Sequence, residues 1–137
     1  MVSERPAGEA LKPEDTLANS ARLLCNLVDL PDGSARGFDP WGDGRDTIFA
    51  VRRNGQVHVY RNQCPHIDGA PLPWRKDAYL NREASRIVCA AHGAQFDIES
   101  GICLLGPCLG QSLQALPHRV DSAGRLLLVL CIATNAE

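Results

Sequence analysis

From Ala21 onward the chain alternates short apolar runs with turns rich in Gly, Pro and Asp, which is the pattern of an all-β protein. The clearest case is the pair of segments 47–53 and 56–61, which flank Asn54-Gly55. Both central residues of a type I′ turn need positive φ, which Asn and Gly tolerate best, so we predict a β-hairpin here. Side chains alternate along its second arm, which puts Val57 and Val59 on one face and His58 and Tyr60 on the other.

Other apolar runs predict the remaining elements, and none carries the pattern of a long amphipathic helix. The last strand is uninterrupted in its apolar character, so we expect it to be buried on both faces. Segment 37–44 reads as a Gly- and Asp-rich loop, and 76–83 has room for a turn or two of helix. The further predicted strands are 22–29, 86–89, 95–98, 113–120 and 125–133, the last two forming a hairpin around Ser122-Ala-Gly124.

The chain length of 137 residues suits one domain, and 45% hydrophobic residues are ordinary for a globular protein. We expect a flexible polar extension over 1–20 and a single domain over 21–137. A net charge of −2 and the lack of any basic run argue against nucleic acid as a partner. The longest apolar run, 126–133, is too short to cross a bilayer, so no membrane partner is expected.

Six cysteines are present, and the N-terminal segment lacks the apolar stretch of a signal peptide. Because no signal peptide is expected, we expect a cytoplasmic location. In the cytoplasm thiols stay reduced, so the cysteines suggest metal binding or burial and not a disulfide framework.

Two short motifs carry the candidate chemistry: Cys64-Pro-His66 and Cys89-Ala-Ala-His92. Together they supply two thiolates and two imidazoles as possible ligands. Such a set can hold one structural zinc ion or one [2Fe–2S] cluster with mixed Cys and His ligands. The residues alone leave both readings open, and the choice matters because zinc would only tie two loops together whereas the cluster would carry electrons.

The two motifs resemble the Rieske [2Fe–2S] pattern, Cys-x-His followed by Cys-x-x-His-Gly. The flanking sequences agree, with Arg61-Asn-Gln before the first motif and Gly93-Ala-Gln-Phe-Asp after the second. Segment 100–107, with Ser100-Gly101 and Gly106-Pro107, is similar to the family's third, proline-bearing loop, which covers the cluster. One departure is the 22 residues between the motifs, 67–88, which exceed the usual spacing. The extra length falls in polar 74–86, which we interpret as a surface excursion.

The resemblance implies a Rieske-like fold of small antiparallel sheets with a cluster-binding subdomain formed by two loops. It implies that Cys64 and Cys89 bind one iron and that His66 and His92 bind the other. With no further domain expected for a substrate or a mononuclear iron, the chain is similar to Rieske ferredoxins, which carry single electrons and are not enzymes themselves. Their redox partners are a flavin reductase and a terminal oxygenase. A small subunit of a larger reductase, as in nitrite reductase, and a zinc-stapled interaction module are the alternatives.

High-potential members of that family place a Ser and a Tyr, whose hydroxyls donate to the cluster, at positions that match Ala94 and Phe96 here. They also link the two loops by a disulfide beside the ligands, where this chain has Ala90 and Ala91. Hydrogen bonds to the sulfurs raise the potential. Their absence predicts a low-potential centre, near roughly −150 mV.

The other cysteines, histidines and tryptophans give weaker signals. Cys103 and Cys108 flank the turn at Gly106-Pro107, and burial as small apolar residues is favoured over a redox switch or extra ligands. The remaining interpretations concern single residues: Cys25 and Cys131 in the core, His58 on the surface of a strand, His118 structural or solvated, and Trp41 and Trp74 on covering loops or a docking face.

Overall fold

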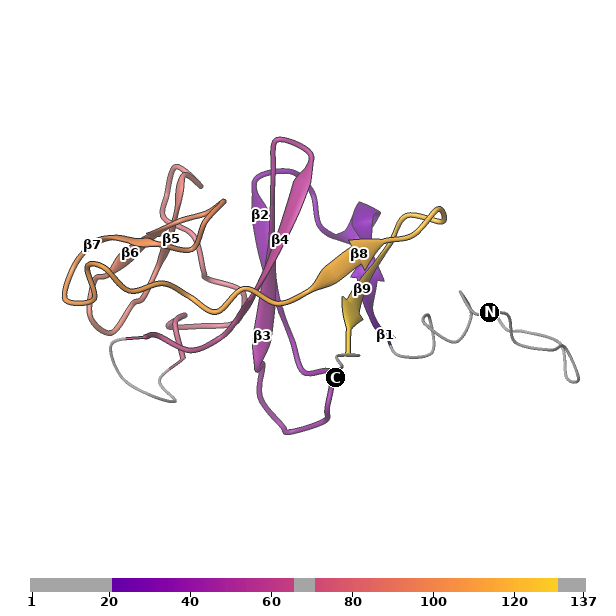
Figure 1. The fold of residues 1–137 in the computed structure, drawn as a ribbon, viewed down its shortest axis with the longest axis horizontal. Coiled ribbons are helices and arrows are strands. Elements are labelled where there is room, and N and C mark those ends of the chain that lie inside the picture. Colours follow the sequence, from indigo (N-terminus) through magenta and orange to yellow (C-terminus); the bar gives the residue numbers. More distant parts are fainter. Residues whose placement is uncertain (1–20, 66–70, 131–137) are drawn as a thin grey trace, which may run out of the picture.

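Three small antiparallel sheets, each of three strands, build the fold (Figure 1). The computed structural model describes residues 21–65 and 71–130. The strand orders are β1-β9-β8, β2-β3-β4 and β5-β6-β7. The strands are β1 (Ala21–Asn26), β2 (Ser34–Phe38), β3 (Ile48–Arg53), β4 (Gln56–Arg61), β5 (Arg86–Val88), β6 (Gln95–Asp97), β7 (Cys103–Leu105), β8 (His118–Val120) and β9 (Arg125–Val129), with one 3₁₀ turn (Leu27–Asp29) after β1. The predicted all-β fold of small antiparallel sheets is confirmed.

The β3–β4 hairpin forms as the Asn-Gly pair predicts, with Asn54 at φ 55° and Gly55 at φ 78°. Its sheet lies between the other two sheets (Figure 1). Both of its faces are buried, because alternate side chains enter two different cores. Phe49, Val51 and Tyr60 belong to the core shared with β5–β7, whereas Ile48, Ala50 and Val59 belong to the core shared with β1 and β9. The predicted alternation of side chains along 56–61 therefore sends alternate residues into two different cores.

The last strand is buried as its apolar run predicts. Leu126, Leu127 and Leu128 are all buried between β1 and β8. The arm before it is shorter than expected, since only His118–Val120 pairs with β9. Upstream of that strand the chain turns to β4 instead, where Arg61 donates to Gln114 O at 2.9 Å and Leu116 donates to Val59 O at 2.9 Å. This arm therefore links the central sheet to the β1-β9-β8 sheet.

Two expectations for the loops are wrong. Segment 37–44 is a loop only in part, because β2 runs to Phe38 and pairs with β3 along its whole length. Segment 76–83 forms turns and no helix. Asp77 and Ala84 have φ values of 65° and 57°, which no helix accommodates. Strand β7 also lies inside segment 100–107, where the sequence predicts a loop with turns and no strand.

The excursion over 74–86 is only partly a surface feature. Tyr79 is fully buried and stacks on Phe49 with ring centroids 4.1 Å apart. Leu80 forms an isolated β-bridge with Ile87. The extra residues thus contribute to the core beneath the β5–β7 sheet. Across the described part of the chain, no helix has the length and apolar character needed to span a membrane.

Tyr60 makes a pH-dependent contribution to stability that can be measured. Burial raises its pKa to about 12, and the nearby Asp97 and Glu99 add to the shift. An unfolded tyrosine ionises near pH 10, so unfolding releases a proton between about pH 10 and about 12. We therefore expect the free energy of unfolding to fall as the pH rises through this window. Tyr60 contributes at most about 3 kcal/mol to that fall, and Tyr79, whose pKa is also raised by burial, adds to it.

Urea unfolding at a series of pH values checks this expectation. Tyr60→Phe is expected to weaken the alkaline loss, although it also removes the hydrogen bond from the hydroxyl to Ile98 O at 2.6 Å. An unchanged alkaline loss in this variant would show that Tyr60 is not its source.

Candidate metal centre

Three of the four predicted ligands come together at the end of the molecule that holds β5–β7. Cys64 follows β4, Cys89 follows β5, and His92 lies between β5 and β6. Their ligand atoms all lie within 4.8 Å of one another, with Cys89 Sγ 3.5 Å from His92 Nδ1. His66 lies outside the described residues. Two segments that are distant in sequence therefore present two sulfurs and one nitrogen to a common point.

A tight turn between β5 and β6 sets the second motif. Cys89 N–H donates to Ala94 O at 2.9 Å, and Gly93 N–H donates back to Cys89 O at 2.8 Å. Gly93 has φ 73°, a conformation that glycine accepts without strain. The turn leaves Cys89 fully buried and His92 half-buried. The thiols thus lie inside, and the imidazole lies closer to solvent.

Burial dominates the electrostatics of the Cys89 thiol. It raises the pKa of Cys89, while backbone N–H groups of His92 and Ala91 directed at the sulfur act in the opposite direction. A metal must displace the thiol proton when it binds, so loading releases protons. The N–H groups can then donate to the thiolate that the metal creates.

The proline-bearing third loop packs directly on the second motif. Gly106 has φ 110°, and a Cβ at this position would lie 2.7 Å from the Ala94 Cα. No side chain fits in so short a gap. Glycine therefore lets the backbone of this loop approach the turn that carries Cys89 and His92.

Cys103 and Cys108 lie on either side of the Gly106-Pro107 turn in this loop and are both buried in the same core as Cys64 and Cys89. The Cys108 thiol lies 3.2 Å from the Cys103 sulfur, and the Cys103 thiol lies 3.4 Å from Leu105 O. Burial, with the neighbouring Cys103 and Cys64, raises the pKa of Cys108 to about 12. The packed, neutral state that we favour from the sequence agrees with this burial.

The remaining residues singled out from the sequence lie away from this centre. Cys25 is buried in the other core, as predicted, whereas Cys131 lies outside the described residues. His118 is structural, with Nδ1 3.0 Å from Leu116 O and Nε2 2.9 Å from Val57 O. His58 is not the surface residue we predict, because its Nε2 is buried without a hydrogen-bond partner and burial lowers its pKa. Trp41 and Trp74 are both exposed.

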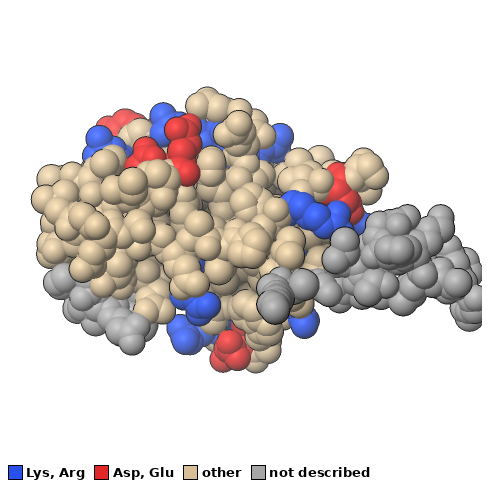
Figure 2. Space-filling model, in the orientation of Figure 1, with Lys and Arg blue, Asp and Glu red and all other residues tan. Residues whose placement is uncertain are grey.

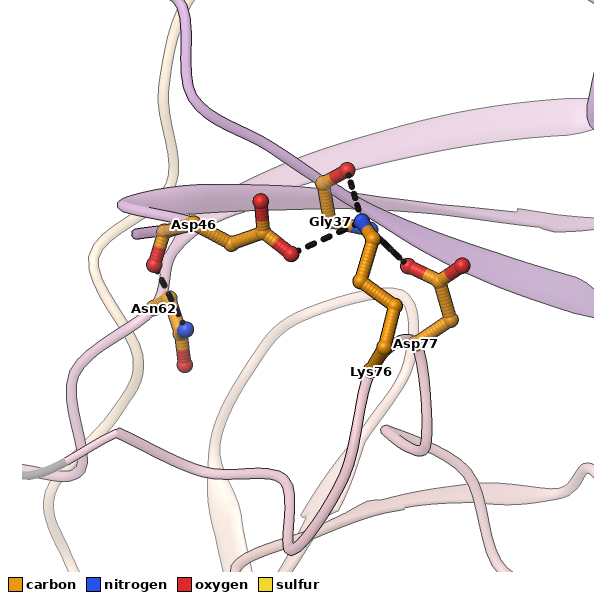
Figure 3. A network of polar contacts seen from close by, with 5 residues as sticks. All are labelled: Gly37, Asp46, Asn62, Lys76 and Asp77. Carbon is orange, nitrogen blue, oxygen red and sulfur yellow. Dashed lines mark hydrogen bonds and ion pairs between the residues drawn. The ribbon is translucent and has the colours of Figure 1, made fainter. Parts of the chain in front are cut away.

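Asn62 is the residue near the site that the sequence analysis misses. Its side chain is buried, and it hydrogen-bonds to Asp46 O and to Leu72 N–H, each at 2.9 Å. Figure 3 shows it beside a network of Gly37, Asp46, Lys76 and Asp77. The available signal is its position two residues before Cys64, but an Asn in a loop carries little information by itself.

The donor set fits a soft metal or an iron–sulfur cluster, because two buried thiols converge with one imidazole nitrogen. An all-β scaffold with such a donor set on two loops defines a metal-binding domain of the iron–sulfur or zinc class. The comparisons decide between these classes. A family model for the Rieske [2Fe–2S] domain matches residues 21–122, so the chain belongs to the Rieske [2Fe–2S] domain family.

Solved structures with the same fold include Rieske-type ferredoxins. The ferredoxin of carbazole 1,9a-dioxygenase from Nocardioides aromaticivorans IC177 is 26% identical with a TM-score of 0.62, and the match covers 80% of this chain and 97% of that one. A ferredoxin of Sphingomonas yanoikuyae B1 is 22% identical with a TM-score of 0.59, covering 78% and 95%. A complex of reduced oxygenase and oxidized ferredoxin in carbazole 1,9a-dioxygenase gives 20% identity and a TM-score of 0.62, covering 80% and 93%. No curated protein matched.

Family membership identifies the cofactor as a Rieske [2Fe–2S] cluster, which excludes the zinc-stapled module. A cluster of this type accepts and donates one electron at a time. The chain is accordingly a Rieske electron-transfer protein.

Proposed function

We propose that the chain is a soluble ferredoxin that passes single electrons from a flavin reductase to a terminal oxygenase within a multicomponent oxidoreductase. The convergence of Cys64, Cys89 and His92 in a Rieske domain similar to oxygenase ferredoxins carries this proposal. In it, Cys64 and Cys89 hold one iron, and His66 and His92 hold the other. The cytoplasmic location and the single domain over 21–137 remain predictions.

The protein's own residues would determine how an electron enters and leaves. The bound cluster supplies the redox chemistry, with the His-ligated iron as the site of the added electron. Buried Cys64 and Cys89 keep the other side away from water, and half-buried His92 lies between exposed Ala91 and exposed Gly93. A partner that docks over these residues would approach the imidazole edge, where the path for the electron is shortest.

The surface beside the site favours docking of a partner by shape and apolar contact over attraction between charges. At the left end of the face in Figure 2, where Figure 1 places β7, most of the visible surface is uncharged, and the charged side chains lie along its upper edge. Ile102, Leu105 and Leu109 are exposed in or beside the third loop, with Leu109 at 65%. This apolar surface also supports a second candidate, a permanently bound small subunit of a larger reductase, since such surfaces mark protein interfaces.

Spectroscopy of the purified full chain tests the proposal. We expect a red-brown protein with two irons per chain and an electron paramagnetic resonance signal after reduction. A colourless protein that holds one zinc ion would overturn it. Purification from the native cell separates the two candidates, because a free carrier elutes as a monomer whereas a subunit elutes with its partner.

The cluster potential is a separate expectation. Ala94 and Phe96 are both fully buried beside the second motif and offer no side-chain hydroxyl. We expect a midpoint potential near roughly −150 mV. The double change Ala94→Ser and Phe96→Tyr should raise it, since each hydrogen bond worth about 1 kcal/mol more to the reduced cluster corresponds to about 40 mV. A redox titration measures both values, and a wild-type potential well above zero would contradict the expectation.

A further inference from the structure

Asn62 has an environment that differs from that of the other polar side chains. Only 5% of its surface is exposed, and among the described residues it is the one polar side chain classed with the core. A buried amide destabilises the fold unless its donor and acceptor are both satisfied. Here Nδ2 donates to Asp46 O and Oδ1 accepts from Leu72 N–H, each at 2.9 Å.

These two hydrogen bonds close the base of the first ligand loop. Asn62 stands two residues before Cys64, and Leu72 stands six residues after His66, so the contact joins the two ends of the loop that carries both ligands. This side-chain contact ties the two ends to each other directly. The side chain of Asn62 therefore holds the two ends, at residues 62 and 72, next to each other.

The same contact reaches the second ligand loop through one more hydrogen bond. Leu72, whose N–H binds Asn62, accepts from Ala90 N–H through its carbonyl at 2.8 Å. Ala90 lies between Cys89 and His92. Leu72 is thus bonded to Asn62 through its N–H and to the second ligand loop through its carbonyl. Through Leu72, Asn62 also sets the separation of the two loops.

The other end of the connection is anchored to the central sheet. Asn62 N–H donates to Thr47 O at 2.9 Å, at the start of β3. Asp46, whose carbonyl accepts from Asn62, binds Lys76 through its carboxylate at 2.8 Å, and Lys76 also donates to Gly37 O at 3.1 Å (Figure 3). The excursion after the first loop thus supplies the lysine that holds the Asp46 segment in place.

We propose that Asn62 is a positioning residue that sets the spacing of the two ligand loops, so that the sulfurs and imidazoles meet the cluster in one geometry. The inference rests on the proposed ligand set. Loss of the side chain leaves Leu72 N–H and Asp46 O without their partner and frees the first loop at its base. The cluster is then held less tightly, and its ligand geometry is less uniform.

The test compares Asn62→Leu, which keeps a similar volume without polar atoms, with the wild-type protein loaded with its cluster. Iron release to a ferrous chelator after reduction is followed in time, together with the electron paramagnetic resonance line shape. We expect release to be roughly 10- to 100-fold faster, as for other residues that support metal ligands. The signal should broaden or shift, which a general loss of stability would not cause.

Asn81→Leu is the matched control. Asn81 also holds a loop together, because its Oδ1 accepts from Ser85 N–H at 2.8 Å and from Arg86 N–H at 3.0 Å. Neither of these hydrogen bonds involves a residue of the ligand loops. Its release rate and line shape should stay near those of the wild type. Equal effects of the two changes, or a wild-type rate in Asn62→Leu, would overturn the inference.

Asn62→Asp tests the positioning role of Asn62 if the leucine variant does not fold. The carboxylate still accepts from Leu72 N–H but cannot donate to Asp46 O, so we expect an intermediate release rate. A wild-type rate would again overturn the inference. A wild-type protein that holds no [2Fe–2S] cluster would instead refute the proposed function, which keeps the two failures distinguishable.

Discussion

Cys89→Ser is expected to abolish the cluster. Cys89 is fully buried, and its sulfur lies 3.5 Å from His92 Nδ1 at the point where the ligands converge. A serine hydroxyl is a hard ligand that stays protonated in a buried site, so it cannot replace the thiolate that iron–sulfur clusters require. We expect a colourless protein with almost no bound iron and no signal after reduction, measured by iron assay and by absorption and paramagnetic resonance spectra.

Two other cysteines serve as controls for this change. Cys25→Ser alters a buried thiol in the core on the other side of the central sheet and should leave the iron content unchanged. Cys103→Ser alters a thiol in the same core as Cys89, so it tests whether a third-loop cysteine is a ligand or only packs there. We expect it to retain both irons. Full iron content in Cys89→Ser, or its loss in Cys25→Ser, would contradict the ligand assignment.

The elements that sequence predicts well here are those governed by local chemistry. Asn54-Gly55 specifies its own turn, and the β3–β4 hairpin follows from the alternation on each side. Cys89 and His92 are brought together by a turn within one hairpin, so their proximity is encoded in their spacing. The pairing of Cys64 with them is long-range and is implied by the family resemblance, not by the local sequence.

The elements that sequence predicts poorly depend on distant partners. Strand β2 is short and has no alternating apolar pattern, and it forms because β3 offers a complete edge to pair with. The excursion looks polar because most of its residues are charged or polar, yet Tyr79 anchors it in the core and Leu80 packs against the same core. Asn62 matters through Asp46 and Leu72, whose positions only the folded chain defines.

The core that contains Cys64 and Cys89 lies on one side of the central sheet. The central sheet separates a mainly aliphatic core at the β1 and β9 end, which also holds Cys25 and Phe38, from a core that includes four cysteines at the β5–β7 end. The second core is enclosed by the ligand loops, the third loop and the excursion. A change that lifts any of these segments therefore opens the surroundings of the cluster directly.

Gly106→Ala is expected to have the largest effect of this kind. A Cβ at Gly106 would lie 2.7 Å from Ala94 Cα and 3.1 Å from its Cβ, and φ is 110°, where an L-residue is strained. Backbone strain and overpacking each cost about 1–3 kcal/mol, so we expect a loss of roughly 2–6 kcal/mol in unfolding free energy and faster cluster release. Gly110→Ala is the matched control, because Gly110 has φ 88° but nothing within 4 Å of its added Cβ. Denaturant unfolding of both loaded variants separates the two contributions: Gly110→Ala should lose only the strain component, and equal losses would show that the contact of the third loop with Ala94 does not support the site.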